Sequence, residues 1–147
     1  MKNFAPTNYT LKCVATDHEF EDAGWTLEDR ECGEPSLIRA IYEKKKLELK
    51  GEEYGLYTFC DWLPVKRLLK GSAAPVTYKS EALAKHLGLK NLYITLNGYS
   101  PKHGAKMTTG SFKETEAYSV CGRMSESEKR VLVVASAGNT ARAFAKV

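Results

Sequence analysis

Residues 131–140 read VLVVASAGNT, an apolar run that leads directly into a cluster of small polar residues. The unbroken run VLVVA at residues 131–135 is typical of a strand that is buried on both faces of a parallel sheet. The polar cluster from Ser136 to Thr140 is expected to form a turn that opens a helix over residues 139–147. This stretch predicts an α/β fold with an open, largely parallel sheet and flanking helices.

The elements before this stretch favour the same fold class. Residues 91–96 (NLYITL) have the alternation and β-propensity of a strand. A helix is expected at residues 112–124, with an apolar face, so that the order from residue 91 onward is β-α-β-α. The other predicted elements are a strand at residues 9–14, a helix or strand at 36–46, a strand at 57–59 and helices at 62–70 and 81–87.

Composition narrows the class of protein. The chain has 147 residues, of which 43% are hydrophobic and 27% charged, as in a globular domain rather than a disordered chain. Its net charge of +4 is scattered along the sequence, which does not predict a nucleic-acid surface. No apolar stretch is long enough to span a bilayer, and the first residues lack the apolar core of a signal peptide. A cytoplasmic protein with reduced cysteines is therefore expected.

Lys113 is the candidate nucleophile. It lies at the start of the helix predicted at residues 112–124, after Gly110 and Ser111 and directly beside Phe112. A lysine that forms a Schiff base must be partly desolvated and held by a stiff backbone, and Phe112 and the helix start offer both. On local sequence alone, the alternative of a surface lysine in a first helical turn is favoured, since most lysines are exposed.

The turn at residues 136–140 is the candidate anion site. At the start of a helix several backbone N–H groups lack partners, and the positive end of the helix dipole lies behind them. Gly138 permits close approach to the backbone, while Ser136, Asn139 and Thr140 add side-chain donors. A carboxylate or phosphate would suit this position. The alternative is an ordinary turn with Asn139 as its cap.

Other chemistry finds little support in the sequence. The glycines at residues 104–113 lack the spacing of a P-loop, and no strand is followed by G-x-G-x-x-G. Cys13, His18 and Cys32 could supply metal ligands, but no C-x-x-C or H-x-x-x-H pair accompanies them, so no metal site is predicted. Lys102, His103 and Lys106, with the threonines that follow, could receive an anion; loops also carry basic residues for no such reason.

In order and spacing, the two motifs resemble the threonine-synthase-like branch of the fold-type II pyridoxal-phosphate enzymes. The resemblance covers residues 70–147. Within this branch, GSFKETEA at residues 110–117 and ASAGNTAR at residues 135–142 look most like cysteate synthases. Threonine synthases usually have Asp-Arg after the lysine, where this chain has Glu114-Thr115, and often carry two C-x-x-C pairs near the N-terminus. Here Cys13 and Cys32 stand with Thr16 and Asp29 at the partner positions.

The resemblance implies a pyridoxal 5′-phosphate-dependent β-replacement in which O-phosphoserine loses phosphate and sulfite adds to give cysteate, a step of coenzyme M biosynthesis. Lys113 would bind the cofactor and, once freed, remove the α-proton. Phe112 and Asn139 would also contact the cofactor, Asn139 through its 3-hydroxyl. The substrate-binding residues implied are Ser136, Ala137, Gly138, Thr140, Thr109 and Lys106. A homo-oligomer is expected for the full-length enzyme.

The resemblance also predicts the domain organisation. Residues 1–70 are expected to be an N-terminal extension with the first elements, and residues 71–147 the N-terminal part of the cofactor-binding α/β domain. The last helix has no glycine, asparagine or proline to end it, which predicts truncation; a naturally short helix is the alternative. The phosphate cradle and the partner of the pyridine nitrogen have no motif in this sequence. A threonine synthase, another phosphoserine-dependent synthase, and a non-catalytic anion-binding fragment are the competing functions.

Overall fold

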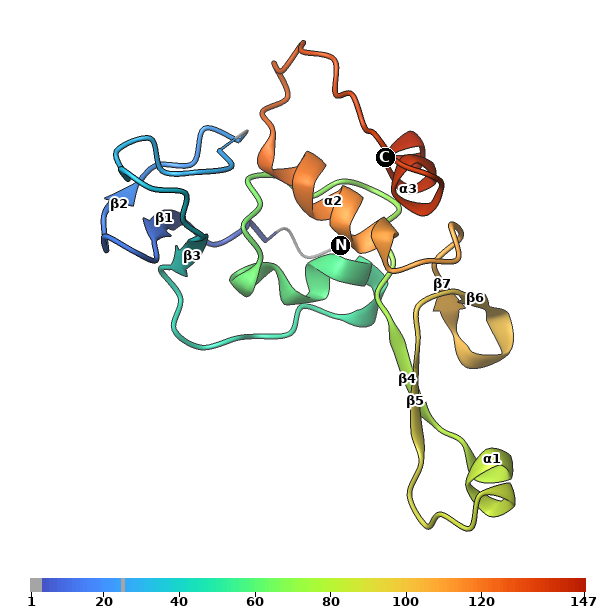
Figure 1. The fold of residues 1–147 in the computed structure, drawn as a ribbon. Helices are drawn as coiled ribbons and strands as arrows, with labels where there is room; N and C mark the ends of the chain where they lie inside the picture. The colour runs from blue at the N-terminus through green and yellow to red at the C-terminus, as the bar shows by residue number, and fades with distance from the viewer. Residues whose placement is uncertain (1–3, 25) are drawn as a thin grey trace.

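The N-terminal part of the chain forms a small antiparallel sheet. The computed structural model describes residues 4–24 and 26–147, and Figure 1 shows their arrangement. Strand β1 (Tyr9–Cys13) lies between β2 (Glu19–Phe20) and β3 (Ile38–Tyr42), and pairs antiparallel with both. The alternation of β1 places Leu11 and Cys13 on the buried face, at 3% and 0% exposure, as expected of a strand with one face in the core.

The 3₁₀ element η1 (Glu52–Trp62) contributes to the hydrophobic core. Tyr57, Cys60 and Val65 pack there with Tyr118 from the C-terminal half of the chain. Gly55 has φ +57°, and a Cβ at this position would overlap the backbone of Ser72, so only glycine fits. The core therefore joins segments that lie far apart in the sequence.

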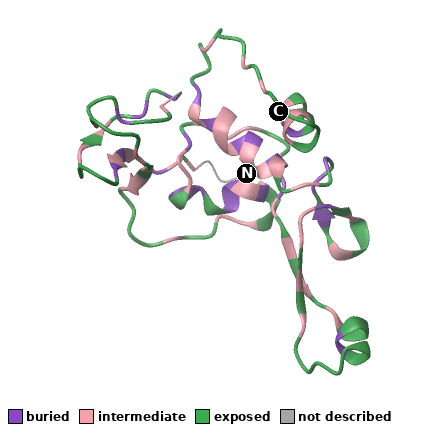
Figure 2. Cartoon of the chain, viewed as in Figure 1, coloured by how far each residue is buried: buried purple, intermediate pink, exposed green. Residues whose placement is uncertain are grey.

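An arm extends away from this core. Strands β4 (Val76–Lys79) and β5 (Tyr93–Leu96) pair antiparallel and are joined through α1 (Glu81–His86). Figure 1 shows the arm pointing away from the other elements, and Figure 2 shows that most of α1 and of the turn leading to β5 is exposed. The chain then returns through β6 (Tyr99–Ser100), η2 (Pro101–His103) and β7 (Ala105–Lys106).

Two helices follow the arm and pack against each other. Helix α2 (Lys113–Arg123) and helix α3 (Asn139–Lys146) are in contact, and Figure 1 shows α3 beside the N-terminal half of α2. Ala117 of α2 and Ala143 of α3 are both fully buried, and their small side chains let the helices approach closely. The packing of the two helices places the predicted lysine helix and the predicted asparagine helix side by side.

A buried ion pair ties α2 to the N-terminal region. Arg123, the last residue of α2, donates two hydrogen bonds to Asp22, with Nε–Oδ2 2.8 Å and Nη2–Oδ1 2.9 Å. The Asp22 side chain is 1% exposed and also accepts a hydrogen bond of 2.5 Å from the Tyr9 hydroxyl. A bidentate ion pair of this kind fixes the relative orientation of the two side chains as well as attracting them.

The predicted mixed α/β class with open sheets is confirmed, but the parallel pairing is wrong for the residues described. All strand pairs among them are antiparallel. Residues 131–135 form no strand, and Val131 and Val133 are 86% and 85% exposed. A strand needs neighbours to accept its backbone hydrogen bonds, and this segment has none in the part of the chain that is described. Its apolar sequence alone does not build a sheet.

The other predicted elements divide into two groups. The strands expected at 9–14 and 91–96, and the helices at 81–87, 112–124 and 139–147, are present with slightly different bounds, and 36–46 contains strand β3. The strand at 57–59 lies instead within η1, and no helix forms at 62–70. There the N–H groups of Lys66 and Arg67 both donate to the carbonyl of Gly122, at 2.8 and 3.0 Å, so tertiary contacts replace helical ones.

None of the helices in the described residues has the length and apolar character that crossing a membrane requires. The division at residue 70 stays a prediction.

Candidate active site

Lys113 is the first residue of α2 and is accessible from solvent. The backbone reaches the helix through Gly110, whose φ of +72° forms the preceding turn and favours glycine. About a third of the Lys113 side chain is exposed, and its Nζ lies 2.6 Å from Glu116 Oε2, one turn along the helix. The same Nζ is 5.0 Å from the ring centroid of Phe112, a residue that is itself 57% exposed. Lys113 is thus partly covered and forms an ion pair with Glu116.

Glu114, the next residue, is fully buried and is hydrogen-bonded to the loop that leads into α2. Its Oε2 accepts a hydrogen bond of 2.9 Å from the backbone N–H of Thr109, and its Oε1 accepts one from Nζ of Lys146 in α3. Thr109 itself is 5% exposed, and its hydroxyl oxygen is buried with no hydrogen-bond partner in the described residues. Burying a hydroxyl without a hydrogen-bond partner costs free energy. The Thr109 hydroxyl is therefore an unused donor in the Thr109–Phe112 loop, the lysine loop, which leads to Lys113.

The turn before α3 offers unpaired backbone donors. Gly138 is the N-cap of α3, and no side chain caps this end. The first helical bond is from Arg142 N–H to the Gly138 carbonyl, at 2.9 Å, while Gly138 N–H donates to the hydroxyl of Ser136 at 3.2 Å. A Cβ on Gly138 would meet nothing within 4 Å, so a ligand could approach the backbone here. Uncapped N–H groups at a helix start attract anions.

The remaining predicted residues lie in three places. Lys106 ends β7 and is exposed. Ser136 and Ala137 lie in the exposed turn before α3, and Asn139 and Thr140 are the first two residues of that helix. The structure brings Lys113 and Asn139 onto two contacting helices, although no hydrogen bond or ion pair between described residues joins Lys113 to the turn. His103 instead stacks on Tyr78, with ring centroids 4.1 Å apart.

Sequence reasoning missed Glu114, Glu116 and Lys146. The position of Glu114 directly after the lysine gave no usable signal, because a carboxylate in a first helical turn is common and is easily read as exposed. The i,i+3 spacing of Lys113 and Glu116 was a usable signal for their ion pair. Nothing local to Lys146 could single it out, since its partner is 32 residues away.

Two of the candidate metal ligands near the N-terminus, Cys13 and His18, interact with neighbouring side chains. His18 Nδ1 lies 3.0 Å from Asp29 Oδ2, and this carboxylate raises the pKa of His18. Hydrogen bonds from Thr16 and Ser36 lower the pKa of the Cys13 thiol to about 6. Within residues 4–24 and 26–147, no group of three or more His, Cys, Asp or Glu side chains could hold a metal ion.

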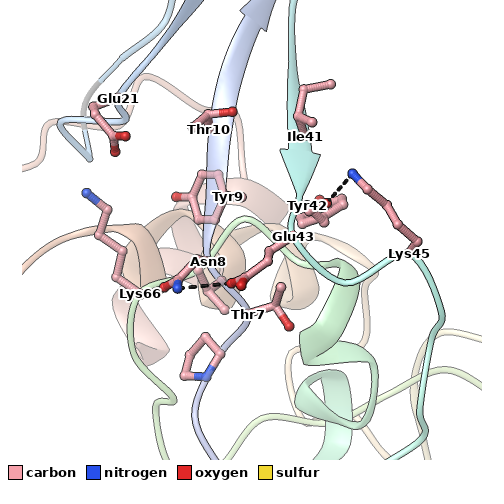
Figure 3. Close-up of a pocket in the computed structure, with 12 residues that line it drawn as sticks. Thr7, Asn8, Tyr9, Thr10, Glu21, Ile41, Tyr42, Glu43, Lys45 and Lys66 are labelled. Atoms are coloured by element: carbon pink, nitrogen blue, oxygen red, sulfur yellow. Dashed lines mark hydrogen bonds between the residues drawn. The ribbon is translucent and has the colours of Figure 1, made fainter.

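A pocket of about 710 Å³ lies elsewhere, between β1, β3 and the segment after η1. Figure 3 shows Asn8, Tyr9, Glu43 and Lys66 around it. None of the predicted site residues lines this pocket. Its lysines are engaged with the protein: Lys45 donates to the carbonyl of Tyr42 at 2.7 Å, and Lys66 to that of Asp22. The chemistry therefore favours the region around Lys113 over this pocket as the candidate active site.

Comparison with known proteins finds curated relatives that are named cysteate synthases. The cysteate synthase of Methanosarcina mazei is 47% identical over 138 residues, which cover 93% of this chain and 32% of that enzyme. Those of Methanosarcina acetivorans and Methanospirillum hungatei are each 46% identical, over 95% and 96% of this chain and 32% and 33% of theirs. No family model and no solved structure matches the chain.

The matching proteins belong, by their names, to the class of enzymes called synthases, and this chain is related to them. In particular, it is a homologue of the cysteate synthases over almost all of its length, which confirms the resemblance found in its sequence. The chain spans about a third of the length of the curated relatives it matches.

Proposed function

We propose that this chain supplies the lysine and the carboxylate-binding turn of a pyridoxal-phosphate-dependent β-replacement enzyme, which converts O-phosphoserine and sulfite to cysteate and phosphate. The observation that carries the proposal is the pairing of α2 and α3, the helices that begin at Lys113 and Asn139. The names of the relatives support cysteate as the product.

The residues present fit the cofactor on the side that faces the lysine. Lys113 Nζ is partly exposed, and the buried hydroxyl of Thr109 lacks a partner. Lys113 would hold the cofactor covalently, with Phe112 beside it and Asn139 hydrogen-bonded to its 3-hydroxyl. When bound, pyridoxal phosphate supplies an aldehyde for an amine and a ring that accepts electrons from the substrate α-carbon.

The chain's own groups would then act in a defined order. The proton on Lys113 Nζ must leave before the amine can react, and Glu116 Oε2 at 2.6 Å is positioned to accept it. The uncapped N–H groups of α3, with Ser136 and Thr140, would hold the substrate carboxylate and so orient its α-carbon. The Lys113 amine would take the α-proton of the substrate as general base. Lys106 and Thr109 would bind the departing phosphate.

Borohydride trapping tests the assignment of Lys113. Full-length protein containing this chain is mixed with pyridoxal phosphate, reduced, digested and mapped by mass spectrometry. The label is expected on Lys113, and the Lys113→Arg variant, which keeps the charge, serves as the control. A folded full-length protein labelled elsewhere, or not at all, would contradict the proposal.

Phosphate release tests the substrate. Release from O-phosphoserine is expected to depend on sulfite and to yield cysteate. Release that proceeds with water on a phosphorylated homoserine would assign the chain to a threonine synthase instead. Labelling of Lys113 without any β-replacement would leave the cofactor assignment standing and reject the cysteate reaction.

A further inference from the structure

The carboxylate of Glu114 is the most deeply buried charge near Lys113. Its residue is 0% exposed, and each of its oxygens has a single partner: the N–H of Thr109 for one and Nζ of Lys146 for the other. A buried carboxylate is stable only when it is paired and hydrogen-bonded. Glu114 therefore depends on two separate segments at once, the loop that leads into α2 and the last turn of α3.

Lys146 reaches across from α3 to meet it. Its side chain is 24% exposed, and its Nζ also lies 5.6 Å from the ring centroid of Tyr118 and 3.5 Å from the carbonyl oxygen of Gly71. This one ammonium group thus contacts α2, the segment before β4 and, through Glu114, the lysine loop. Lys146 lies one turn beyond the buried Ala143, on the face of α3 that packs against α2.

We propose that the Glu114–Lys146 ion pair is a positioning device for the catalytic lysine, which fixes the Thr109–Phe112 loop and helix α3 in one arrangement. Glu114 directly follows Lys113 in sequence, and α3, which carries Lys146, is preceded by the turn that would bind the substrate carboxylate. The inference rests on the proposed function, because only there do Lys113 and the turn act on one molecule. Glu114 and Lys146 touch no reacting atom in this scheme, and so they are positioning residues.

Stability alone does not account for a charge pair at this place. The helices are already in contact, with Ala117 and Ala143 fully buried, and a buried ion pair is often no more stabilising than apolar side chains of the same volume. A charge pair differs from apolar packing in its direction, since each oxygen of Glu114 must face its own donor. A displacement of α3 along α2 would break the pair, whereas apolar contact could slide.

The test compares Lys146→Met with Lys146→Arg in the full-length protein, with Lys85→Met as matched control. Lys85 is an exposed lysine in the last turn of α1, as Lys146 is in the last turn of α3. The first readout uses no cofactor: formaldehyde and cyanoborohydride methylate the amines, and mass spectrometry gives the rate at Lys113 relative to the exposed Lys90. The second readout is the rate of pyridoxal-phosphate trapping at Lys113.

Lys146→Met is expected to change the Lys113:Lys90 labelling ratio at least threefold and to slow trapping about tenfold in molecules that remain folded by circular dichroism. Lys146→Arg keeps the ion pair and should stay within twofold of the unmodified protein in both readouts, as should Lys85→Met. A labelling ratio and trapping rate that are unchanged in folded Lys146→Met would overturn the inference. Wild-type protein that is never trapped at Lys113 would contradict the proposed function instead, and the labelling ratio would still report the position of the amine.

If Lys146→Met does not fold, the double variant Glu114→Gln/Lys146→Met removes both charges and keeps an oxygen for the N–H of Thr109. This variant is expected to fold. Its Lys113:Lys90 labelling ratio should still differ at least threefold from that of the unmodified protein, because α3 is no longer tied to the Thr109–Phe112 loop. A ratio equal to that of the unmodified protein would show that the pair serves folding only, and would reject the positioning role.

Discussion

The N-terminal sheet and the segment between α2 and α3 both have strand-forming sequences, yet only the sheet forms strands. Strand β1 has a partner on each side, β2 and β3, and its inward side chains are buried. Residues 131–135 are more apolar than β1, but they run as irregular chain with Val131 and Val133 in solvent. Strand propensity reflects packing on a half-buried surface, and here the surface is present for one segment and not for the other.

The two regions also differ in how their charges are placed. Asp22, which follows β2, and Asp61 of η1 have buried carboxylates; Asp61 meets Lys44 at 3.0 Å and Lys50 at 2.8 Å. The segment between α2 and α3 includes an ion pair between Arg130 and Glu128, which are two residues apart in sequence. The pair of Asp22 with Arg123, in contrast, joins residues that are far apart in sequence.

Acid should act mainly on the first region, and this is the largest effect expected. Burial raises the pKa of Asp22, but hydrogen bonds from Arg123 and Tyr9 outweigh burial and hold it at about 2. Burial likewise raises the pKa of Asp61, and Lys50 and Lys44 outweigh it to give about 2. Because both values lie below the ordinary 3.8, their stabilisation is complete above that pH and is lost as the pH falls through about 2.

Melting temperatures measured at a series of pH values from 5 to 2 report this loss of stability. The melting temperature should fall across the interval in the unmodified protein, and fall less in Asp22→Asn, which has one fewer carboxyl to protonate. Equal falls in the two proteins would show that Asp22 carries no such linkage.

Asp22→Ala tests the link between the sheet and α2. It leaves Arg123 without its buried partner and is expected to lower the free energy of unfolding by about 3–5 kcal/mol, measured by urea denaturation. Glu48→Ala is the control, since Glu48 is 66% exposed and pairs with Lys50 at 3.6 Å. That exposed pair should be worth less than about 1 kcal/mol. Similar losses in both variants would mean that the Asp22–Arg123 pair does not hold the two regions together.

Val133→Asp has the smallest expected effect and tests whether residues 131–135 are a strand in solution. With the side chain in solvent, the substitution should change the free energy of unfolding of the 147-residue chain by less than about 0.5 kcal/mol. The comparison is Val65→Asp, where the side chain is 1% exposed and a buried charge should cost several kcal/mol. A large loss from Val133→Asp would instead indicate that the segment is packed in a sheet.

Part of the fold and of the candidate site could be predicted from local sequence. Residues 9–13 alternate, and residues 113–123 have a helical apolar face, so these two elements follow from periodicity. Lys113 and Asn139 lie at predicted helix starts, and the structure has each as the first residue of its helix. The role of Glu114 could not be predicted, because its burial depends on Lys146 and Thr109 closing around it. The helix predicted at residues 62–70 was wrong for the same reason. The carbonyl of Gly122 accepts backbone hydrogen bonds from Lys66 and Arg67 that a helix would have used.

The sequence by itself determined where several helices begin, which segments have strand character, and that a lysine and a turn of small polar residues each open a helix, because these depend on neighbours a few residues away. Only the tertiary structure decided which strands pair, which carboxylates are buried, and that α3 lies against α2 with Lys146 on Glu114. Backbone hydrogen bonds between strands and ion pairs across the core require partners that are distant in sequence. Their formation depends on which surfaces meet when the chain folds.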